Sequence, residues 1–208
     1  GTFWNNEFSP VLINVGTGRT AVAVSAGSVS TCVLLDDGSV KCWGGDNNGV
    51  LGDGGNAVPI TDTNTPPSTP LDLGTGRTAV AISLGVGTHA CVLLDDASIK
   101  CWGSDSSGQL GNGGSITADQ TSPPSTSIDL GTGRTAVAVS VGNSHTCAIL
   151  DDASIKCWGR DYWGELGDGA SQTGNQLTPY PVSGSYTWDT TTTPSSGSGT
   201  GATETFTF

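Results

Sequence analysis

Six cysteines are the residues of this chain whose type and spacing could do chemistry. They form three pairs whose members are separated by nine residues: Cys32 and Cys42, Cys91 and Cys101, Cys147 and Cys157. Such pairs either form disulfides or serve as reactive thiols or metal ligands. Metal-binding cysteine pairs usually stand about two to four residues apart, so the wider spacing favours three disulfides.

Each pair lies in a segment with the pattern of a β-hairpin. In the first copy an apolar run ends at Leu35, Asp-Asp-Gly turns the chain, and a β-branched run begins at Ser39. A three-residue loop places Leu35 opposite Ser39, and counting outward places Cys32 opposite Cys42. We expect this to be a non-hydrogen-bonded pair, where side chains approach most closely and a disulfide can form. The same count pairs the cysteines of the other two copies.

The other polar groups fit structural roles better than chemical ones. His89 and His145 precede the first cysteine of their copies by two residues, where the first copy has Ser30, and the repeats supply no partners for a metal or a reaction. The Asp-Asp pairs fall in hairpin turns, which favours solvated turn residues over paired-carboxylate chemistry. The Asp/Asn/Gly loops lack the alternating spacing of a calcium loop, which leaves at most weak calcium binding. We therefore expect no enzyme activity, no obligatory metal and no cofactor.

The heptapeptide Gly-Thr-Gly-Arg-Thr-Ala-Val also occurs three times, and it is not a phosphate-binding loop. It lacks the Gly-Lys-Ser/Thr ending, and a β-pattern follows it where a phosphate loop has a helix. Its arginines, Arg19, Arg77 and Arg134, are expected to pair with acids or carbonyls of their own repeat.

Composition excludes several classes of partner. The 208 residues carry a net charge of −12, and six of the seven basic residues fall at equivalent repeat positions. No basic patch is left for nucleic acid or for an acidic membrane surface, and no apolar run is long enough to span a bilayer. An even cysteine count and a first residue that is Gly1 predict a mature secreted protein, or the exported part of a longer one, in an oxidising extracellular or cell-surface location.

The elements that position the cysteines are repeats. The heptapeptide starts at Gly16, Gly74 and Gly131, which gives repeats at 16–73, 74–130 and 131–182 after an N-terminal strand segment at 1–15. In each repeat we expect three or four strands. These are an apolar run before the heptapeptide, the strand that begins at the Thr-Ala-Val end of the heptapeptide, and the two arms of the hairpin. A Thr/Ser/Gly-rich tail at 183–208 ends in an alternating strand pattern, Thr203 to Phe208.

Aromatic side chains outside the repeat pattern are the candidates for binding a partner. Tyr162 and Trp163 occur in only one of the three glycine-rich loops, where they could stack on a sugar, anchor a partner or simply pack. The remaining candidates lie at the two ends of the chain: Phe3, Trp4, Phe206 and Phe208.

The hairpin motif, Cys-Val-Leu-Leu-Asp-Asp-Gly-Ser-Val-Lys-Cys-Trp-Gly followed by Asp-x-x-Gly-x-Leu-Gly-Asp-Gly, resembles the repeat of the regulator-of-chromosome-condensation family over residues 9–182. It is most similar to the bacterial extracellular branch, in which paired cysteines flank the hairpin. The resemblance implies a β-propeller, commonly seven-bladed, with one four-stranded blade per repeat. Family members include a nuclear exchange factor for a small GTPase and secreted binding proteins such as an inhibitor of β-lactamases, so it implies protein recognition and no single function.

Together these features predict an all-β, propeller-like array of three four-stranded blades. Three blades cannot close a propeller, so we expect the N- and C-terminal strands to complete a blade internally or between subunits. The expected function is that of an extracellular structural subunit of a surface assembly or fibre, with a pilus-like subunit as one form of it, whose partners are copies of itself or another extracellular protein. The alternative is a secreted recognition or inhibitor domain that acts through its variable loops.

Overall fold

The structure is a computed structural model, and it describes residues 11–55, 64–87, 89–114, 118–169 and 174–183. Within these residues it contains ten strands, one short 3-10 turn and no α-helix, so the all-β expectation is confirmed. The elements, in chain order, are β1 (Ala21–Ala26), β2 (Ser30–Leu35), β3 (Val40–Gly44), η1 (Asn47–Gly49), β4 (Ala79–Leu84), β5 (His89–Leu94), β6 (Ile99–Gly103), β7 (Ala136–Val141), β8 (His145–Leu150), β9 (Ile155–Gly159) and β10 (Gln176–Pro181).

The hairpin register is the one the sequence predicts. The Leu35 N–H donates to the Ser39 carbonyl at 2.9 Å, and Cys32 pairs directly with Cys42. The same register pairs the cysteines of β5 with β6 and of β8 with β9. The last loop residue adopts a positive φ in all three hairpins, 76° at Gly38, 61° at Ala97 and 63° at Ala153. The three-residue loop is therefore built with glycine once and with alanine twice.

The strands form three sheets, which we call blades 1, 2 and 3 (β1–β3, β4–β6 and β7–β10). Only blade 3 has the expected fourth strand, because β10 pairs with β9, whereas blades 1 and 2 have three strands. The apolar runs before the heptapeptide, expected to be strands, are irregular segments that follow the outer strand of the preceding hairpin. Leu71 N–H donates to the Val40 carbonyl and Ile128 N–H to the Ile99 carbonyl, both single contacts. Strand β10 forms at the edge of blade 3 although it contains Pro179 and Pro181, which an edge strand tolerates, so proline content does not separate it from these runs.

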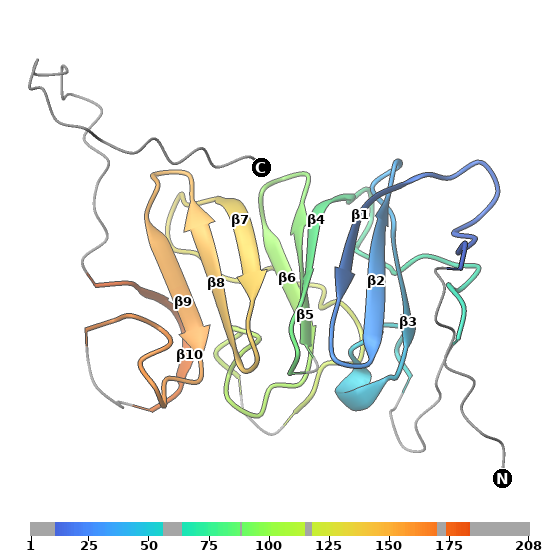
Figure 1. Ribbon diagram of the computed structural model, residues 1–208. Coiled ribbons are helices and arrows are strands. Elements are labelled where there is room, and N and C mark those ends of the chain that lie inside the picture. Colours follow the sequence, from blue (N-terminus) through green and yellow to red (C-terminus); the bar gives the residue numbers. More distant parts are fainter. Residues whose placement is uncertain (1–10, 56–63, 88, 115–117, 170–173, 184–208) are drawn as a thin grey trace, which may run out of the picture.

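The blades stand side by side in one row, with their hairpin loops pointing the same way (Figure 1). Strand β1 contacts β4 and β4 contacts β7, and these first strands of the three blades form the inner edge of the row. We call the side of a blade that faces the next blade in the chain its forward face, and the opposite side its rear face. One core cluster fills the joint between blades 1 and 2, and a second fills the joint between blades 2 and 3. The core of the molecule thus lies between the sheets, as in a propeller.

The alanines at positive φ offer a direct test of the turn geometry. Ala153 lies in the left-handed region, which destabilises the fold by roughly 1–2 kcal/mol for a residue with a β-carbon. Glycine avoids this strain, but its greater conformational entropy in the unfolded chain offsets about half of the gain in stability. We expect Ala153→Gly to raise the free energy of unfolding by about 0.5–1 kcal/mol. Chemical denaturation measures this, and Ala138→Gly, inside strand β7, is the matched control and should be destabilising. A loss of stability in Ala153→Gly would contradict the assigned turn.

Candidate functional site

The three disulfides lie on the forward faces of the blades. Each joins directly opposed strand residues with Cα atoms 4.1 Å apart: Cys32–Cys42, Cys91–Cys101 and Cys147–Cys157. The first pair belongs to the cluster between blades 1 and 2, and the second to the cluster between blades 2 and 3. No free cysteine is present among the described residues. The cysteines are thus cross-links within each hairpin and packing surface for the next blade, with no thiol left for chemistry.

A tryptophan occupies the rear face at the equivalent position of each blade. Trp102 and Trp158 are fully buried against the preceding blade. Their indole Nε1 groups donate to the carbonyls of Val50 and Gln109, each at 2.9 Å. Among the described residues no sheet precedes blade 1, and its Trp43 is only half-buried. The Cys-Trp-Gly repeat in the sequence was the signal for this role, which sequence reasoning did not assign.

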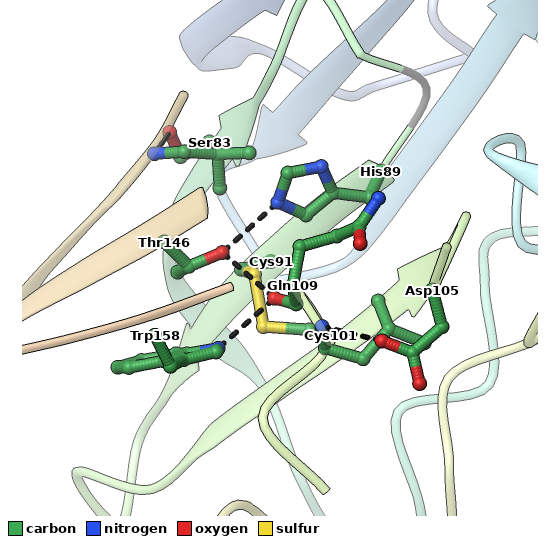
Figure 2. Close-up of a disulfide and its surroundings, with 10 residues drawn as sticks. Ser83, His89, Cys91, Cys101, Asp105, Gln109, Thr146 and Trp158 are labelled. Atoms are coloured by element: carbon green, nitrogen blue, oxygen red, sulfur yellow. Dashed lines mark hydrogen bonds between the residues drawn. A yellow bond between two sulfur atoms is a disulfide. The ribbon is translucent and has the colours of Figure 1, made fainter. Parts of the chain in front are cut away.

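His89 belongs to a buried hydrogen-bonded chain across the joint between blades 2 and 3 (Figure 2). The Thr146 hydroxyl donates to the Gln109 carbonyl at 2.9 Å, so it can only accept from His89, whose Nε2 lies 2.9 Å away. This assigns the proton to Nε2 and leaves Nδ1 buried without a partner among the described residues. Burial, followed by the nearby His145, lowers the pKa of His89 to about 3. His89 is therefore a neutral structural histidine, as expected.

His145 does not complete a reactive pair with His89. It is half-buried with its ring against Gly142, and burial lowers its pKa, partly offset by the Glu165 carboxylate. Within the part of the chain that the structure describes, no group of three or more His, Cys, Asp or Glu side chains could hold a metal ion.

The Asp-Asp turns and the heptapeptide arginines pair within each blade. Arg19 contacts Asp37 at 3.1 Å, Arg77 contacts Asp96 at 2.7 Å and Arg134 contacts Asp152 at 2.6 Å. This confirms the expectation for the arginines. Hydrogen bonds from the turn's own serine lower the pKa of the second aspartate in each turn. These carboxylates are thus held by the arginine and the serine of their own blade, the contacts expected of turn residues.

The glycine-rich loops share a rigid frame with two variable positions. A buried aspartate starts each loop, and its Oδ1 accepts a hydrogen bond from the N–H of the leucine five residues on, at 3.0–3.2 Å: Asp46 to Leu51, Asp105 to Leu110 and Asp161 to Leu166. Burial raises the pKa of Asp46 and Asp105. The two residues after the aspartate are Asn-Asn, Ser-Ser and Tyr-Trp in the three loops. The frame thus presents a different dipeptide from each blade.

Tyr162 and Trp163 are exposed on the blade 3 loop, at 59% and 78%. Their rings meet edge to face with centroids 4.9 Å apart. The loop beneath them is held by Glu165, which accepts from Arg160 Nε at 2.9 Å and from the Trp163 N–H at 2.6 Å. Tyr162 also lines a shallow hollow with Arg160, Asp161 and residues 174–175. The aromatic pair is therefore not core packing but a presented surface.

The forward face of blade 3 is a second presented surface. Ile149 and Ile155 are 44% and 37% exposed, whereas the equivalent Leu93 and Ile99 of blade 2 are 6% and 0% exposed. The difference arises because blade 2 is covered by blade 3, while no described residue stacks as a further sheet on blade 3. We call Ser140, Cys147, Ile149 and Ile155 the open forward face.

Comparison with known proteins identifies the repeat. The family described as "Regulator of chromosome condensation (RCC1) repeat" matches residues 21–50, 79–109 and 136–164. A second family model with the same description matches residues 100–149. The chain belongs to the RCC1-repeat family. Each of the three matches begins at an inner strand and runs through the hairpin into the glycine-rich loop, so the matched unit contains both the disulfide and the loop frame.

Relatives share the repeats over most of this chain. The human E3 ubiquitin-protein ligase HERC2 is 27% identical over 80% of the chain, and the Ultraviolet-B receptor UVR8 of Arabidopsis thaliana is 28% identical over 79%. The chain corresponds to only 3% of the first protein and 34% of the second. The RCC1-repeat chain thus spans only a minor part of each relative, and the activities and partners of those whole proteins are not carried over to it.

Solved structures confirm the propeller-type fold. Yeast RCC1 (Prp20), in its complex with Kap60, superposes with a TM-score of 0.68 at 19% identity, covering 83% of this chain and 39% of that one. Human WBSCR16 gives a TM-score of 0.65 at 21% identity, covering 80% of this chain and 40% of that one. The fold of the RCC1-repeat chain thus corresponds to 39–40% of the length of each of these solved chains.

Some sequence expectations lie outside the described residues. These are the proposed partner-binding roles of Phe3, Trp4, Phe206 and Phe208, and the terminal strand at 203–208. Among the described residues, no helix has the length and apolar character needed to cross a membrane.

Proposed function

We propose that this RCC1-repeat chain is a non-enzymatic extracellular structural protein that associates with copies of itself in a surface assembly or fibre. The observation that carries the proposal is the open forward face of blade 3. Two β-branched side chains are exposed there, at positions where the apolar equivalents in blades 1 and 2 are buried, at 0–6% exposure. Apolar sheet faces of this kind favour association because covering them removes apolar surface from water.

The extracellular location is supported by the disulfides. All six cysteines are paired, and each pair closes a short loop within one hairpin. Such cross-links form and persist in oxidising compartments. The proposal also assigns the chain no catalytic role, because the aspartates and the histidine described above are engaged in turns, loop frames and one buried joint.

Strand exchange is the second contact that we propose between subunits. The segment Thr203 to Phe208 alternates polar and apolar residues and follows a Thr/Ser/Gly-rich stretch. Such a segment can add to the free edge of a neighbouring sheet, where main-chain hydrogen bonds hold it and Phe206 and Phe208 are buried. Deleting residues 203–208 is then expected to weaken assembly and leave a folded monomer.

Assembly tests the proposal directly. Analytical ultracentrifugation over increasing concentration, with electron microscopy of the same samples, is expected to show oligomers of the wild-type chain. Ile149→Lys places a charge on the open forward face and should return the protein to monomers without unfolding it. Val137→Lys is the matched control, because Val137 is exposed on β7 and its equivalent Val80 stays exposed inside the row. A wild-type chain that stays monomeric at high concentration would rule out self-assembly.

A second candidate function rests on the aromatic pair. Tyr162 and Trp163 are held by a rigid loop and exposed, which suits recognition of another extracellular protein or a sugar. Replacing both with serine copies the blade 2 loop, Ser106-Ser107, and therefore keeps the loop frame. Loss of binding to an extracellular partner with unchanged self-association would favour this candidate over assembly.

A further inference from the structure

Two joints between blades repeat the same three hydrogen bonds. An inner-strand N–H donates to the turn carbonyl of the preceding blade at 2.8 Å, from Ala79 to Gly38 and from Ala136 to Ala97. The last residue of the inner strand donates its N–H to a serine hydroxyl of the preceding blade, from Leu84 to Ser25 and from Val141 to Ser83, at 2.9 and 3.1 Å. The rear-face tryptophan donates to a loop carbonyl, as described above. A joint is therefore specified by three donors on a rear face and three acceptors on a forward face.

The acceptors of one more joint are present on blade 3. At the equivalent positions stand the Ala153 carbonyl, the Ser140 hydroxyl and the Glu165 carbonyl. Among the residues that the structure describes, none of the three accepts a hydrogen bond of the kind found at the two joints. By equivalence with blades 1 and 2 they belong to the same forward face as the exposed Ile149 and Ile155, so the polar and apolar parts of a forward face are both in place.

The donors of one more joint are present on blade 1. The equivalent groups are the N–H groups of Ala21 and Ala26 and the indole of Trp43. Gly27 N–H donates to Ser30 within the blade, so the alternation of the strand directs the Ala26 N–H away from β2. Within the described residues the Trp43 indole has no acceptor, in contrast to Trp102 and Trp158.

The exposed part of the rear face of blade 1 carries these donors. Ala21 and Ala26 are exposed, Trp43 is half-buried, and Val24 is 70% exposed although its equivalents Ile82 and Val139 pack into the joints. Val33 and Leu35, in the middle of this face, are already buried in the single chain. The surface that remains open is thus the inner strand together with the tryptophan.

We propose that a second copy of this chain docks the open part of its blade 1 rear face, the inner strand β1 together with Trp43, on the open forward face of blade 3, repeating the hydrogen bonds of the internal joints. This inference rests on the proposed self-assembly and specifies its polarity. The contact is head to tail, since donors and acceptors lie at opposite ends of the row. A contact of this kind propagates from copy to copy, into a closed ring or an open fibre according to the rotation at each joint.

Mixing two half-blocked variants tests the polarity. Ile149→Lys blocks the forward face of blade 3, and Val24→Lys blocks the rear face of blade 1. Each variant alone is expected to be monomeric, because each lacks one half of the joint. Their equimolar mixture keeps one complete joint and should give a dimer of one copy of each and nothing larger. Val137→Lys added to either variant is the control and should leave the mixed dimer unchanged.

Other results would overturn the inference in distinguishable ways. A dimer formed by either blocked variant alone would show a symmetric contact between like faces. Blocked variants that assemble as well as wild type would show that the copies associate through another surface, such as the terminal strand, while the proposed assembly function would stand. A wild-type chain that never self-associates would remove the proposed function itself. As a finer measure, Ser140→Ala is expected to weaken the mixed dimer about 3- to 10-fold, the usual effect of one lost hydrogen bond.

Discussion

Replacing Trp102 with alanine is expected to lower the free energy of unfolding by about 3–5 kcal/mol, the usual loss for a fully buried tryptophan. The side chain is wholly buried between blades 1 and 2, where it packs closely over Gly52. Its removal leaves a cavity in the joint and also leaves the Val50 carbonyl without the Nε1 donor that now lies 2.9 Å away. Chemical denaturation of the oxidised protein, which keeps the disulfides intact, measures the effect.

Trp43 provides the matched control within the same chain. It occupies the same hairpin position in blade 1, but it is half-buried and has no acceptor among the described residues. Trp43→Ala should therefore cost clearly less than Trp102→Ala. Equal losses for the two variants would mean that the tryptophans stabilise their own hairpins and that the joint between blades contributes little.

Acidification is expected to destabilise the protein through His89. Its pKa is about 3 in the folded chain, against 6.5 as the ordinary value. Below pH 6.5 the unfolded chain takes up a proton that the folded chain does not, so stability is full above pH 6.5 and falls as the pH drops toward 3. Each pH unit in this range corresponds to about 1.4 kcal/mol, which predicts a loss of roughly 3 kcal/mol between pH 7 and pH 4.5.

The variant His89→Gln separates this effect from the other titrations. Glutamine keeps a side-chain donor for the Thr146 hydroxyl and cannot be protonated in this range. Denaturation curves at pH 7 and pH 4.5 should differ markedly for wild type and much less for His89→Gln. A pH dependence that is the same in both proteins would show that His89 is not the responsible group.

The local structure could be predicted from the sequence because it depends on neighbours along the chain. The Asp-Asp-Gly and Asp-Asp-Ala turns fix a three-residue loop, the loop fixes the register, and the register places Cys32 opposite Cys42. The all-β class follows from patterns of the same short range, and the repeats follow from the recurrence of the heptapeptide at Gly16, Gly74 and Gly131. The arginine pairs with the turn aspartates were predicted for the same reason.

The number of strands in each blade could not be predicted this way. The runs before the heptapeptide carry apolar residues typical of strands, yet only β10 of blade 3 forms a fourth strand. Proline does not distinguish the cases, because β10 itself contains Pro179 and Pro181 and still pairs with β9 at the edge of its sheet. The outcome depends on how each connector meets the outer hairpin strand, which the local pattern does not specify.

The sequence by itself determined the repeats, the hairpins and the disulfides of this protein, since these require only residues close in the chain. Only the tertiary structure decided which equivalent residues are buried and which are exposed. Trp43 and Trp102 stand in nearly identical segments, as do Ile149 and Leu93, and their burial differs because one of each pair faces another blade. The same holds for the link of His89 to Thr146 across 57 residues of sequence. Burial is set by what packs on a face, and that neighbour is fixed by the stacking order of the blades.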